Sequence, residues 1–234
     1  MAIILTYGKA NNNTSTLTVT GLTISVGFSV GVIAFITGSA DETGHGSCVD
    51  SSGSNTYTQR GTTFFRAGFG WTSECFTAAN VGASATSVTW TPPTIGTNFG
   101  MSAAVWVLNP NTGIITYADV KQADVTSTVT TTNGVATANI ATTTANSLIV
   151  AMGTDTQSST LSAGTAMSAD TVPTAGVIPE HQFVSAATPA QWTDSTAAHY
   201  AIFAGLGFDW TATATPFTPF TKTHFFVTDT TVQM

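Results

Sequence analysis

Apolar and hydroxyl-bearing side chains alternate along most of this chain, and this period of two constrains the fold more than any other feature. The runs STLTVT (residues 15–20) and TSVTWT (residues 86–91) place every second side chain on one face, as a half-buried β-strand does. Threonine, about a fifth of the residues, suits such strands because it is β-branched and its hydroxyl satisfies an exposed face without charge. Helical periodicity is almost absent, so the sequence predicts an all-β protein.

Four longer runs are apolar on both faces. They are FSVGVIAFIT, FGMSAAVWVL, SLIVAMG and HYAIFAGLGFDW, at residues 28–37, 99–108, 147–153 and 199–210. Continuous apolar runs of this kind predict central strands that are covered on both sides. With strands recurring at intervals of about 8–12 residues, the pattern predicts an antiparallel β-sandwich, jelly-roll-like, with two facing sheets of about six to eight strands each.

Three weaker patterns add detail to this prediction. Asn133-Gly134 between two Thr/Val/Ala runs predicts a hairpin turn. The stretch from 163 to 196 is rich in Ala, Thr, Ser and Pro, which predicts long loops at one end of the sandwich. GFSVGVIAFITGSAD in the first half and ANSLIVAMGTDTQSS in the second both run from an apolar strand through glycine to a polar loop, which hints at a duplication.

The length of 234 residues fits one large domain or two small ones, and we predict a single β-sandwich domain over residues 1–234. A chain of this size buries about 70% of its unfolded surface, so it needs no disulfide framework to fold. Residues 1–20 and 211–234 are candidate arms that contact neighbouring subunits. The second of these holds an alternating Phe-Thr-Pro segment, which could also pack on the chain's own sandwich.

Charge is scarce. Charged residues make up 7% of the chain, against about 25% in ordinary soluble domains. The net charge is −7, and the permanent cations are scattered: Lys9, Arg60, Arg66, Lys121 and Lys222. Without a basic stripe, we predict no binding to nucleic acid. A neutral, hydroxyl-rich surface favours association, which fits a protein that works inside an assembly.

The N-terminal sequence MAIILTYGKANNN lacks the basic and apolar regions of a signal peptide, and no apolar run approaches 18 residues. We therefore expect neither export by a signal peptide nor insertion into a membrane. The composition nevertheless looks extracellular. A virion protein meets both conditions, because it is made in a host cytoplasm and leaves by lysis.

The segment DETGHGSCVD (residues 41–50) is the densest group of metal-ligand types. Asp41, Glu42 and Asp50 are weak candidates for a Ca²⁺ site, because carboxylate oxygens suit that ion. The spacing matches no EF-hand loop, and a zinc site would need a further His or Cys pair. The alternative, which we favour, is a solvated loop between strands. We expect no cofactor.

The overlapping stretch DSSGSNTYT (residues 50–58) predicts a structured turn. Asp50 and the serines can accept hydrogen bonds from backbone amides two residues on, and Gly53 supplies a positive φ where one is needed. Tyr57 is then expected to pack its ring and expose its hydroxyl. For Cys48 and Cys75 two interpretations stay open: a disulfide that closes the intervening loop, or two free thiols that behave as small apolar residues.

Aromatic residues at loop tips would suggest sugar stacking or a subunit interface, with core packing as the default. The candidates are Tyr57, Trp71 and Trp192. The string GFSVG at residues 27–31 has the G-x-S-x-G spacing, but it runs into a predicted strand and no helix is predicted after it, as a nucleophile elbow would require. The chain has no H-E-x-x-H motif, and we predict that it is not an enzyme. A hydrolase would need His181 or His199 in a pocket beside Asp or Ser.

Three pieces of the chain, DSSGSNTYT, FTAANVGASATSVTW and MSAAVWVLN, follow one another in a recognisable order. Together they resemble a β-sandwich module of tailed-bacteriophage virion proteins of the decoration, fibre or appendage type, also seen in modular secreted bacterial proteins. Its turn pattern, D-S-x-G-N-x-Y/W-T, is matched by Asp50, Gly53, Asn55, Tyr57 and Thr58, with Ser54 inserted. Its second pattern is approximated by Asn80, Val81, Gly82, Ala83, Val88 and Trp90. Where that module often continues into E-x-S-G, this chain has LNPNTG.

The resemblance covers roughly residues 28–120 and implies a structural or adhesive module, with no catalytic residues. We therefore predict a non-enzymatic virion structural protein of a tailed phage, which decorates the head or forms part of a fibre, collar or tail appendage. Its expected partners are copies of itself and other virion proteins. The alternative is a carbohydrate-binding module, on a receptor-binding fibre for example, that recognises host surface glycans.

Overall fold

A computed structural model describes residues 4–12, 15–37, 44–66, 70–93, 100–126, 134–140, 147–155, 161–163, 167–170, 177–184, 188–194 and 200–213. Every regular element in these ranges is a β-strand, as the sequence predicts. The first eight strands are β1 Ile4–Asn12, β2 Leu17–Ile24, β3 Ser29–Thr37, β4 Ser47–Asp50, β5 Thr58–Arg66, β6 Trp71–Ala78, β7 Ala85–Thr91 and β8 Gly100–Asn109. The second eight are β9 Gly113–Thr126, β10 Gly134–Ile140, β11 Ser147–Asp155, β12 Leu161–Ala163, β13 Ser168–Ala169, β14 Val177–Val184, β15 Thr188–Asp194 and β16 Tyr200–Ala212.

The strands form four antiparallel sheets, and the second half of the chain repeats the strand order of the first. Large sheet 1 has the order β1-β8-β3-β6-β5 and small sheet 1 the order β2-β7-β4. Large sheet 2, read from its other end, is β9-β16-β11-β14-β13, and small sheet 2 is β10-β15-β12. Adding eight to each strand number of the first half gives the second. The chain is therefore built from two copies of one eight-stranded topology.

Within each half the pairing is nested. The first strand pairs with the eighth, the second with the seventh and the third with the sixth. This is the pairing of a jelly roll, except that the fifth strand pairs with the sixth rather than with the fourth. The expected pair of sheets with six to eight strands each is thus replaced by two sandwiches of five and three strands.

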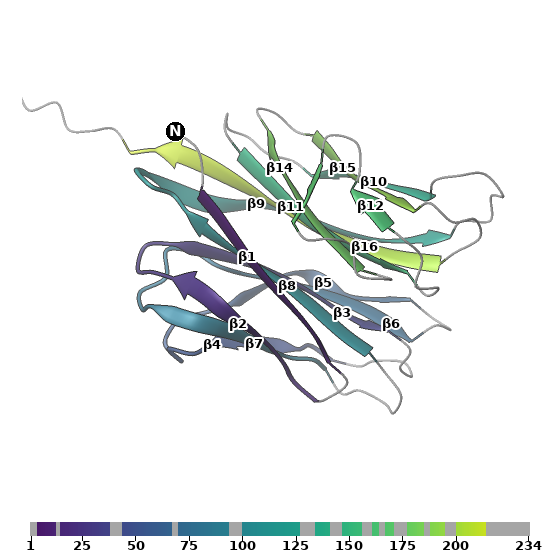
Figure 1. The fold of residues 1–234 in the computed structure, drawn as a ribbon, viewed down its shortest axis with the longest axis horizontal. Helices are drawn as coiled ribbons and strands as arrows, with labels where there is room; N and C mark the ends of the chain where they lie inside the picture. Colours follow the sequence, from purple (N-terminus) through teal and green to yellow (C-terminus); the bar gives the residue numbers. More distant parts are fainter. Residues whose placement is uncertain are drawn as a thin grey trace, which may run out of the picture.

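The four sheets stack as layers, with the two large sheets back to back in the middle (Figure 1). Along β3 the side chains divide between two cores. Val30, Val32 and Ala34 face small sheet 1, whereas Ile33 and Phe35 face large sheet 2. Both faces of β3 are therefore covered, which confirms the prediction made from its continuous apolar run.

The core between the two large sheets joins the halves of the chain. Trp106 of β8 and Phe208 of β16 are among its largest fully buried side chains. A Cβ on Gly31 would lie 2.9 Å from the Phe208 ring, so the missing side chain is what lets β16 approach β3 this closely. On the outer side of large sheet 2, Ile140 of β10 lies over Gly205, which seats small sheet 2 on that layer.

The predicted duplication is visible in the register of equivalent strands. In large sheet 1, Ala34 of β3 pairs with Glu74 of β6. In large sheet 2, Ala151 of β11 pairs with Glu180 of β14. Both glutamates are fully buried, and each faces the small sheet of its own half. The two sequences that hinted at a repeat, around β3 and β11, form the middle strands of the two large sheets.

The interpretation of residues 163–196 as long loops is wrong. This stretch contains β13, β14 and β15, and Val177 to Glu180 are buried. Proline and polar residues within these strands obscure the alternation, while pairing with β11 supplies the burial. The Asn133 half of the expected hairpin turn lies outside the described residues, and β10, which begins at Gly134, pairs with β15.

The two candidate arms have different positions. Residues 4–12 form β1 at the edge of large sheet 1, paired with β8 of the same chain, and residues 17–20 begin β2. Of the second arm, residues 211–213 are described and residues 214–234 are not. Contact of either arm with a neighbouring subunit stays a prediction. In the described parts of the chain no helix is present, and hence none that could cross a bilayer.

Candidate functional site

The turn after β4 is organised by the Asp50 carboxylate. Its Oδ1 accepts hydrogen bonds from the Ser52 backbone N (3.0 Å) and Oγ (2.5 Å). Its Oδ2 accepts from Asn55 Nδ2 at 2.6 Å and from the Tyr57 hydroxyl at 3.3 Å. Ser52 Oγ in turn accepts from the Ser54 backbone N, and Gly53 has a φ of 65°. The predicted side-chain turns and the positive φ of Gly53 are confirmed.

Asn55 fastens this turn to the loop between β6 and β7. Its Nδ2 donates to Ala83 O at 2.8 Å as well as to Asp50. Its Oδ1 accepts from the backbone N of Gly82 and of Ala83, each at 3.0 Å. The two donors and two acceptor positions of the amide are therefore all used inside the protein. This side chain is a clamp between two segments that lie almost thirty residues apart.

Tyr57 completes the clamp rather than presenting a free hydroxyl. Its half-buried ring packs against the core between the first two sheets, and its hydroxyl donates to Asp50. Burial raises the pKa of Tyr57 far above its usual value, and the Asp50 charge adds to the shift. The phenol therefore stays protonated and keeps donating. The hydroxyl that we expected to be exposed is hydrogen-bonded to Asp50 of the turn.

Asp50 makes the stability of this turn depend on pH. Burial acts to raise the pKa of its carboxyl, but hydrogen bonds from Ser52, Asn55 and Tyr57 outweigh burial and hold the pKa below its usual value. A carboxyl with a lowered folded pKa stabilises the fold above its unfolded pKa of about 4, and the contribution is lost as the pH falls through the folded value.

We therefore expect Asp50→Asn to destabilise the protein by about 1–3 kcal/mol at pH 7 and to make its stability less dependent on pH below about pH 4. Urea unfolding followed by circular dichroism at pH 7 and in steps down to pH 3 measures both effects. An unchanged acid limb in the variant would show that Asp50 does not contribute this pH dependence.

A second polar cluster surrounds Glu74 at the opposite end of small sheet 1. Its Oε1 accepts from Gly46 N at 2.7 Å, Thr63 Oγ1 at 2.8 Å and Gln59 Nε2 at 3.2 Å. Its Oε2 accepts from Trp90 Nε1 at 2.9 Å. A side chain on Gly46 would collide with this carboxylate, so glycine is required there. The fully buried Glu74 thus ties β5, β6, β7 and the chain before β4 together.

A third cluster crosses from one half of the chain to the other. Asp170 lies between β13 and β14. Its Oδ1 lies 2.5 Å from His181 Nδ1, and its Oδ2 accepts a hydrogen bond from Trp106 Nε1 at 2.7 Å. Asp170 is 5% exposed and His181 20%. A histidine beside a carboxylate is part of what a hydrolase would need. Ser168 is the cross-strand neighbour of His181, yet no hydrogen bond joins the two side chains.

A cavity lined by described residues lies elsewhere, beside the Asn55 clamp. It has a volume of about 240 Å³ and is lined by Ser54, Asn55 and Thr56 together with residues 78–82. Asn80 holds a φ of 48°, in the left-handed region, and the backbone N of Val81 donates to Phe28 O. Hydroxyl, amide and backbone groups thus surround the space.

The disulfide interpretation of Cys48 and Cys75 is corrected: both thiols are free and buried. Cys48 faces the core between small sheet 1 and large sheet 1, whereas Cys75 faces the core between the large sheets. The body of large sheet 1 separates them. Burial raises the pKa of both thiols, and the nearby Glu74 charge adds to this effect.

Because the thiolate is the reactive form, we expect neither cysteine to react with iodoacetamide in the native protein. In urea without reductant, both should be alkylated, and mass spectrometry counts the added groups. A denatured chain that takes up no alkyl group unless it is first reduced would contradict the free thiols.

The remaining predicted site residues are placed as follows. Asp41, Glu42 and His199 lie outside the described residues, as does the side chain of Trp192, whose backbone belongs to β15. Within the described ranges no group of three or more His, Cys, Asp or Glu side chains could hold a metal ion. Trp71 is 2% exposed in the core between the large sheets, so its ring does not lie at the surface as a sugar contact would.

Sequence reasoning missed the roles of Asn55, Glu74 and Asp170 in these clusters. A lone carboxylate inside an otherwise buried strand, as in WTSECFTA, was the available signal for Glu74. No protein-family model matches the chain, and the search of curated proteins finds no match.

Proposed function

We propose that this chain is a non-enzymatic structural protein of a tailed-phage particle, which decorates the head or forms part of a fibre, collar or tail appendage. The observation that supports it best is that the side chains of the motif residues form hydrogen bonds within the protein. The Asp50 carboxylate, the Asn55 amide and the Tyr57 hydroxyl are all hydrogen-bonded to other groups of the protein. A motif that braces two loops is what a structural module needs.

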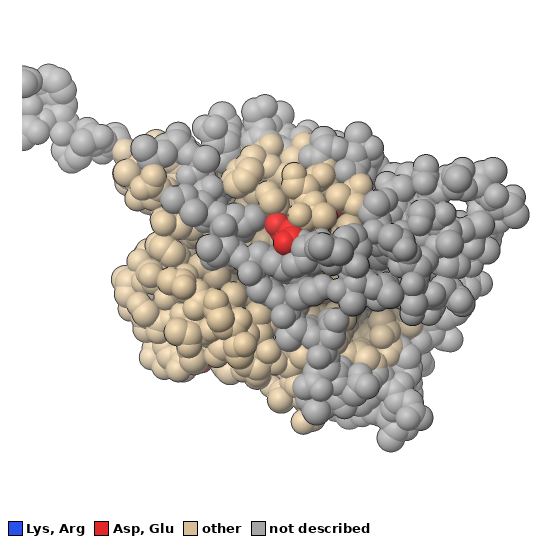
Figure 2. All heavy atoms as spheres, viewed as in Figure 1, with Lys and Arg blue, Asp and Glu red and all other residues tan. Residues whose placement is uncertain are grey.

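The layered build supports the same role. Two large sheets packed back to back and flanked by two small sheets form a block whose rigidity comes from shared cores (Figure 1). On the face in Figure 2 the described surface is almost uncharged, apart from one small acidic group near its centre. Such a surface suits lasting contact with neighbouring subunits better than free diffusion among charged partners.

The test is the position of the chain in an intact assembly. Particles purified from a lysate of the producing host are analysed by quantitative mass spectrometry, and immunogold labelling locates the chain on them. We expect a fixed copy number per particle and labelling confined to the head or to one tail structure. Abundant chain in the soluble lysate, with none in the particles, would overturn the proposal.

A carbohydrate-binding role is the second candidate, and the cavity beside Asn55 favours it. Its lining of hydroxyl, amide and backbone groups can exchange hydrogen bonds with sugar hydroxyls. A glycan array measures this, with Asn80→Gly as the matched variant, because glycine keeps the left-handed backbone while removing the amide. Binding that Asn80→Gly abolishes supports this role, and an array without signal removes it.

A further inference from the structure

Phe183, near the end of β14, is the most exposed of the aromatic side chains that the structure describes, at 45%. A single exposed apolar residue is normal at a protein surface and carries no argument by itself. The Phe183 ring, however, lies against the ring of His181. Their centroids are 5.6 Å apart, and their planes meet at 78°. An apolar ring and a polar ring therefore adjoin on one face of β14.

Buried groups from both halves of the chain hold the His181 ring in place. Its Nδ1 lies 2.5 Å from Asp170 Oδ1, and Asp170 Oδ2 accepts a hydrogen bond from Trp106 Nε1 at 2.7 Å. Asp170 is 5% exposed and Trp106 is fully buried, so the carboxylate is fixed on two sides. An imidazole oriented in this way has little conformational entropy left to lose when it binds a ligand.

The contact with Asp170 also determines what the second ring nitrogen of His181 can do. A carboxylate accepts hydrogen bonds, so Nδ1 of the neutral imidazole carries the hydrogen and Nε2 keeps a lone pair. No described residue forms a hydrogen bond with Nε2, and the side chain is 20% exposed. His181 therefore presents an acceptor to a ligand that carries an O–H or N–H donor.

Ser168 adds a hydroxyl on the same face. It lies directly opposite His181 in the pairing of β13 with β14, and cross-strand neighbours project to the same side of a sheet. Ser168 is exposed, and β13 begins at this residue, so β13 does not extend alongside Phe183. We call Ser168, His181 and Phe183 the Phe183 platform. It combines a hydroxyl, an acceptor nitrogen and an apolar ring.

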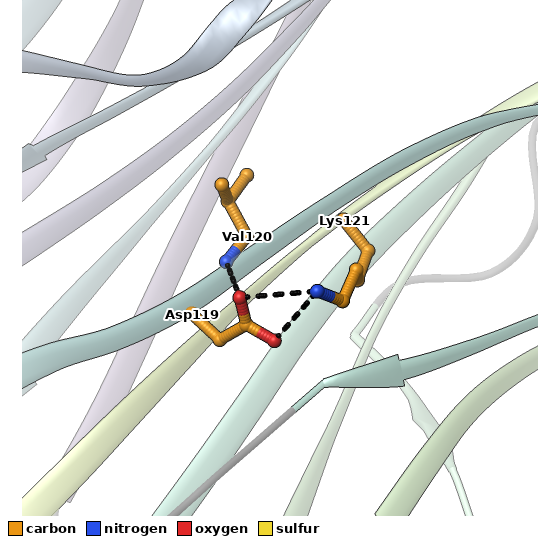
Figure 3. A network of polar contacts seen from close by, with 3 residues as sticks. All are labelled: Asp119, Val120 and Lys121. Atoms are coloured by element: carbon orange, nitrogen blue, oxygen red, sulfur yellow. Dashed lines mark hydrogen bonds and ion pairs between the residues drawn. The ribbon is translucent and has the colours of Figure 1, made fainter.

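The charges of large sheet 2 disfavour an acidic ligand on the platform. The strands of this sheet hold one permanent cation, Lys121, on β9 at the opposite edge from β13. Lys121 Nζ lies 3.1 Å from Asp119 Oδ2, and Asp119 Oδ1 accepts a hydrogen bond from the Val120 backbone N (Figure 3). Beside His181 lies the carboxylate of Asp170, which would repel an anion. The platform therefore fits an uncharged ligand.

We infer that the Phe183 platform is a binding site for a neutral saccharide. The C–H face of a pyranose ring lies on the Phe183 ring, and a sugar hydroxyl donates to His181 Nε2. A second sugar hydroxyl exchanges a hydrogen bond with Ser168. This site goes beyond the proposed structural role and does not depend on it. It also lies in the other half of the chain from the cavity beside Asn55.

A glycan array that carries neutral and acidic oligosaccharides tests the site on the full chain, and calorimetric titration with the strongest array glycan gives its dissociation constant. We expect neutral glycans to bind. Phe183→Ala should raise the dissociation constant about tenfold or more, because it removes the ring on which the sugar lies. Phe183→Tyr keeps that ring and should bind as the wild type does. Ile114→Ala, which removes an exposed apolar side chain from β9, is the matched control and should change nothing.

The imidazole nitrogens of His181 provide a second test that does not depend on a variant. We expect the ¹⁵N resonance of His181 Nε2 to shift when the strongest array glycan is added. The resonances of His45, in the first half of the chain, should not move. His181→Gln should raise the dissociation constant about two- to tenfold, since the ligand loses one hydrogen-bond acceptor.

Several results would overturn the site. They are an array without a bound neutral glycan, binding of acidic glycans alone, a Phe183→Ala variant that binds as Ile114→Ala does, and a His181 Nε2 resonance that stays in place. Binding that Asn80→Gly abolishes and Phe183→Ala leaves intact would assign the sugar to the cavity instead. Particles that lack the chain would overturn the structural role and leave this site standing.

Discussion

Trp106→Ala is expected to lower the free energy of unfolding by about 4–5 kcal/mol. The indole is fully buried between the two large sheets, and its removal leaves a cavity in the core that joins the halves. It also removes Nε1, which donates a hydrogen bond to Asp170 Oδ2 at 2.7 Å. Urea unfolding followed by far-ultraviolet circular dichroism measures the loss without relying on tryptophan fluorescence.

Trp106→Phe reduces the cavity while still removing the donor, since it keeps a six-membered ring and loses the smaller ring that carries Nε1. We expect a loss of about 1–3 kcal/mol from it. Combining it with Asp170→Asn in a double-mutant cycle should give a coupling energy of about 0.5–3 kcal/mol. Strictly additive losses would mean that the hydrogen bond between the halves does not contribute to stability.

Glu74→Gln is expected to lower the free energy of unfolding by about 2–4 kcal/mol. Both carboxylate oxygens accept hydrogen bonds: one from Gly46, Gln59 and Thr63, and the other from Trp90. An amide in either orientation turns an NH₂ group toward donors, so at least one buried donor loses its acceptor. The side chain has no access to water that could replace it.

Asp119→Asn is the matched control for this charge change. It also converts an acid to an amide, but at a partly exposed position whose partner Lys121 is 44% exposed. Exposed ion pairs contribute about 0–1 kcal/mol, so this variant should remain close to wild type in urea unfolding. Equal losses in the two variants would mean that overall charge, rather than the contacts of Glu74, determines the effect.

The sequence predicts the strands better than it predicts their layers. The runs that form β3 and β8 are apolar at even and odd positions alike, so they predict burial on both faces. They do not say which sheet covers which face, because valine and isoleucine suit either core equally. One sandwich and two stacked sandwiches therefore predict the same runs, and only the pairing of distant strands separates them.

For the polar clusters, contacts between neighbouring residues can be predicted from the sequence, whereas contacts between distant segments cannot. The contacts within residues 50–54 are local, so Asp50, Ser52 and Gly53 could be interpreted from the sequence as a turn. The hydrogen bonds that the backbone amides of Gly82 and Ala83 donate to Asn55 join segments that only the folded chain brings together, and so does the bond from Trp90 to Glu74. Whether Cys48 and Cys75 form a disulfide also depends on contacts between distant segments. Large sheet 1 lies between the two residues, and the sequence does not show this layer.

The nested pairing of first and eighth strands also governs how the chain can fold during synthesis. Large sheet 1 cannot close until Asn109 has left the ribosome, and large sheet 2 cannot close until Ala212 has done so. At about 5–20 residues per second, the roughly one hundred residues between them take about 5–20 seconds to make. All-β domains fold in about milliseconds to seconds, so the first sandwich can form alone in that interval. The face of large sheet 1 that carries Trp106 is then exposed to water until large sheet 2 forms. During these seconds the nascent chain is most prone to misassembly.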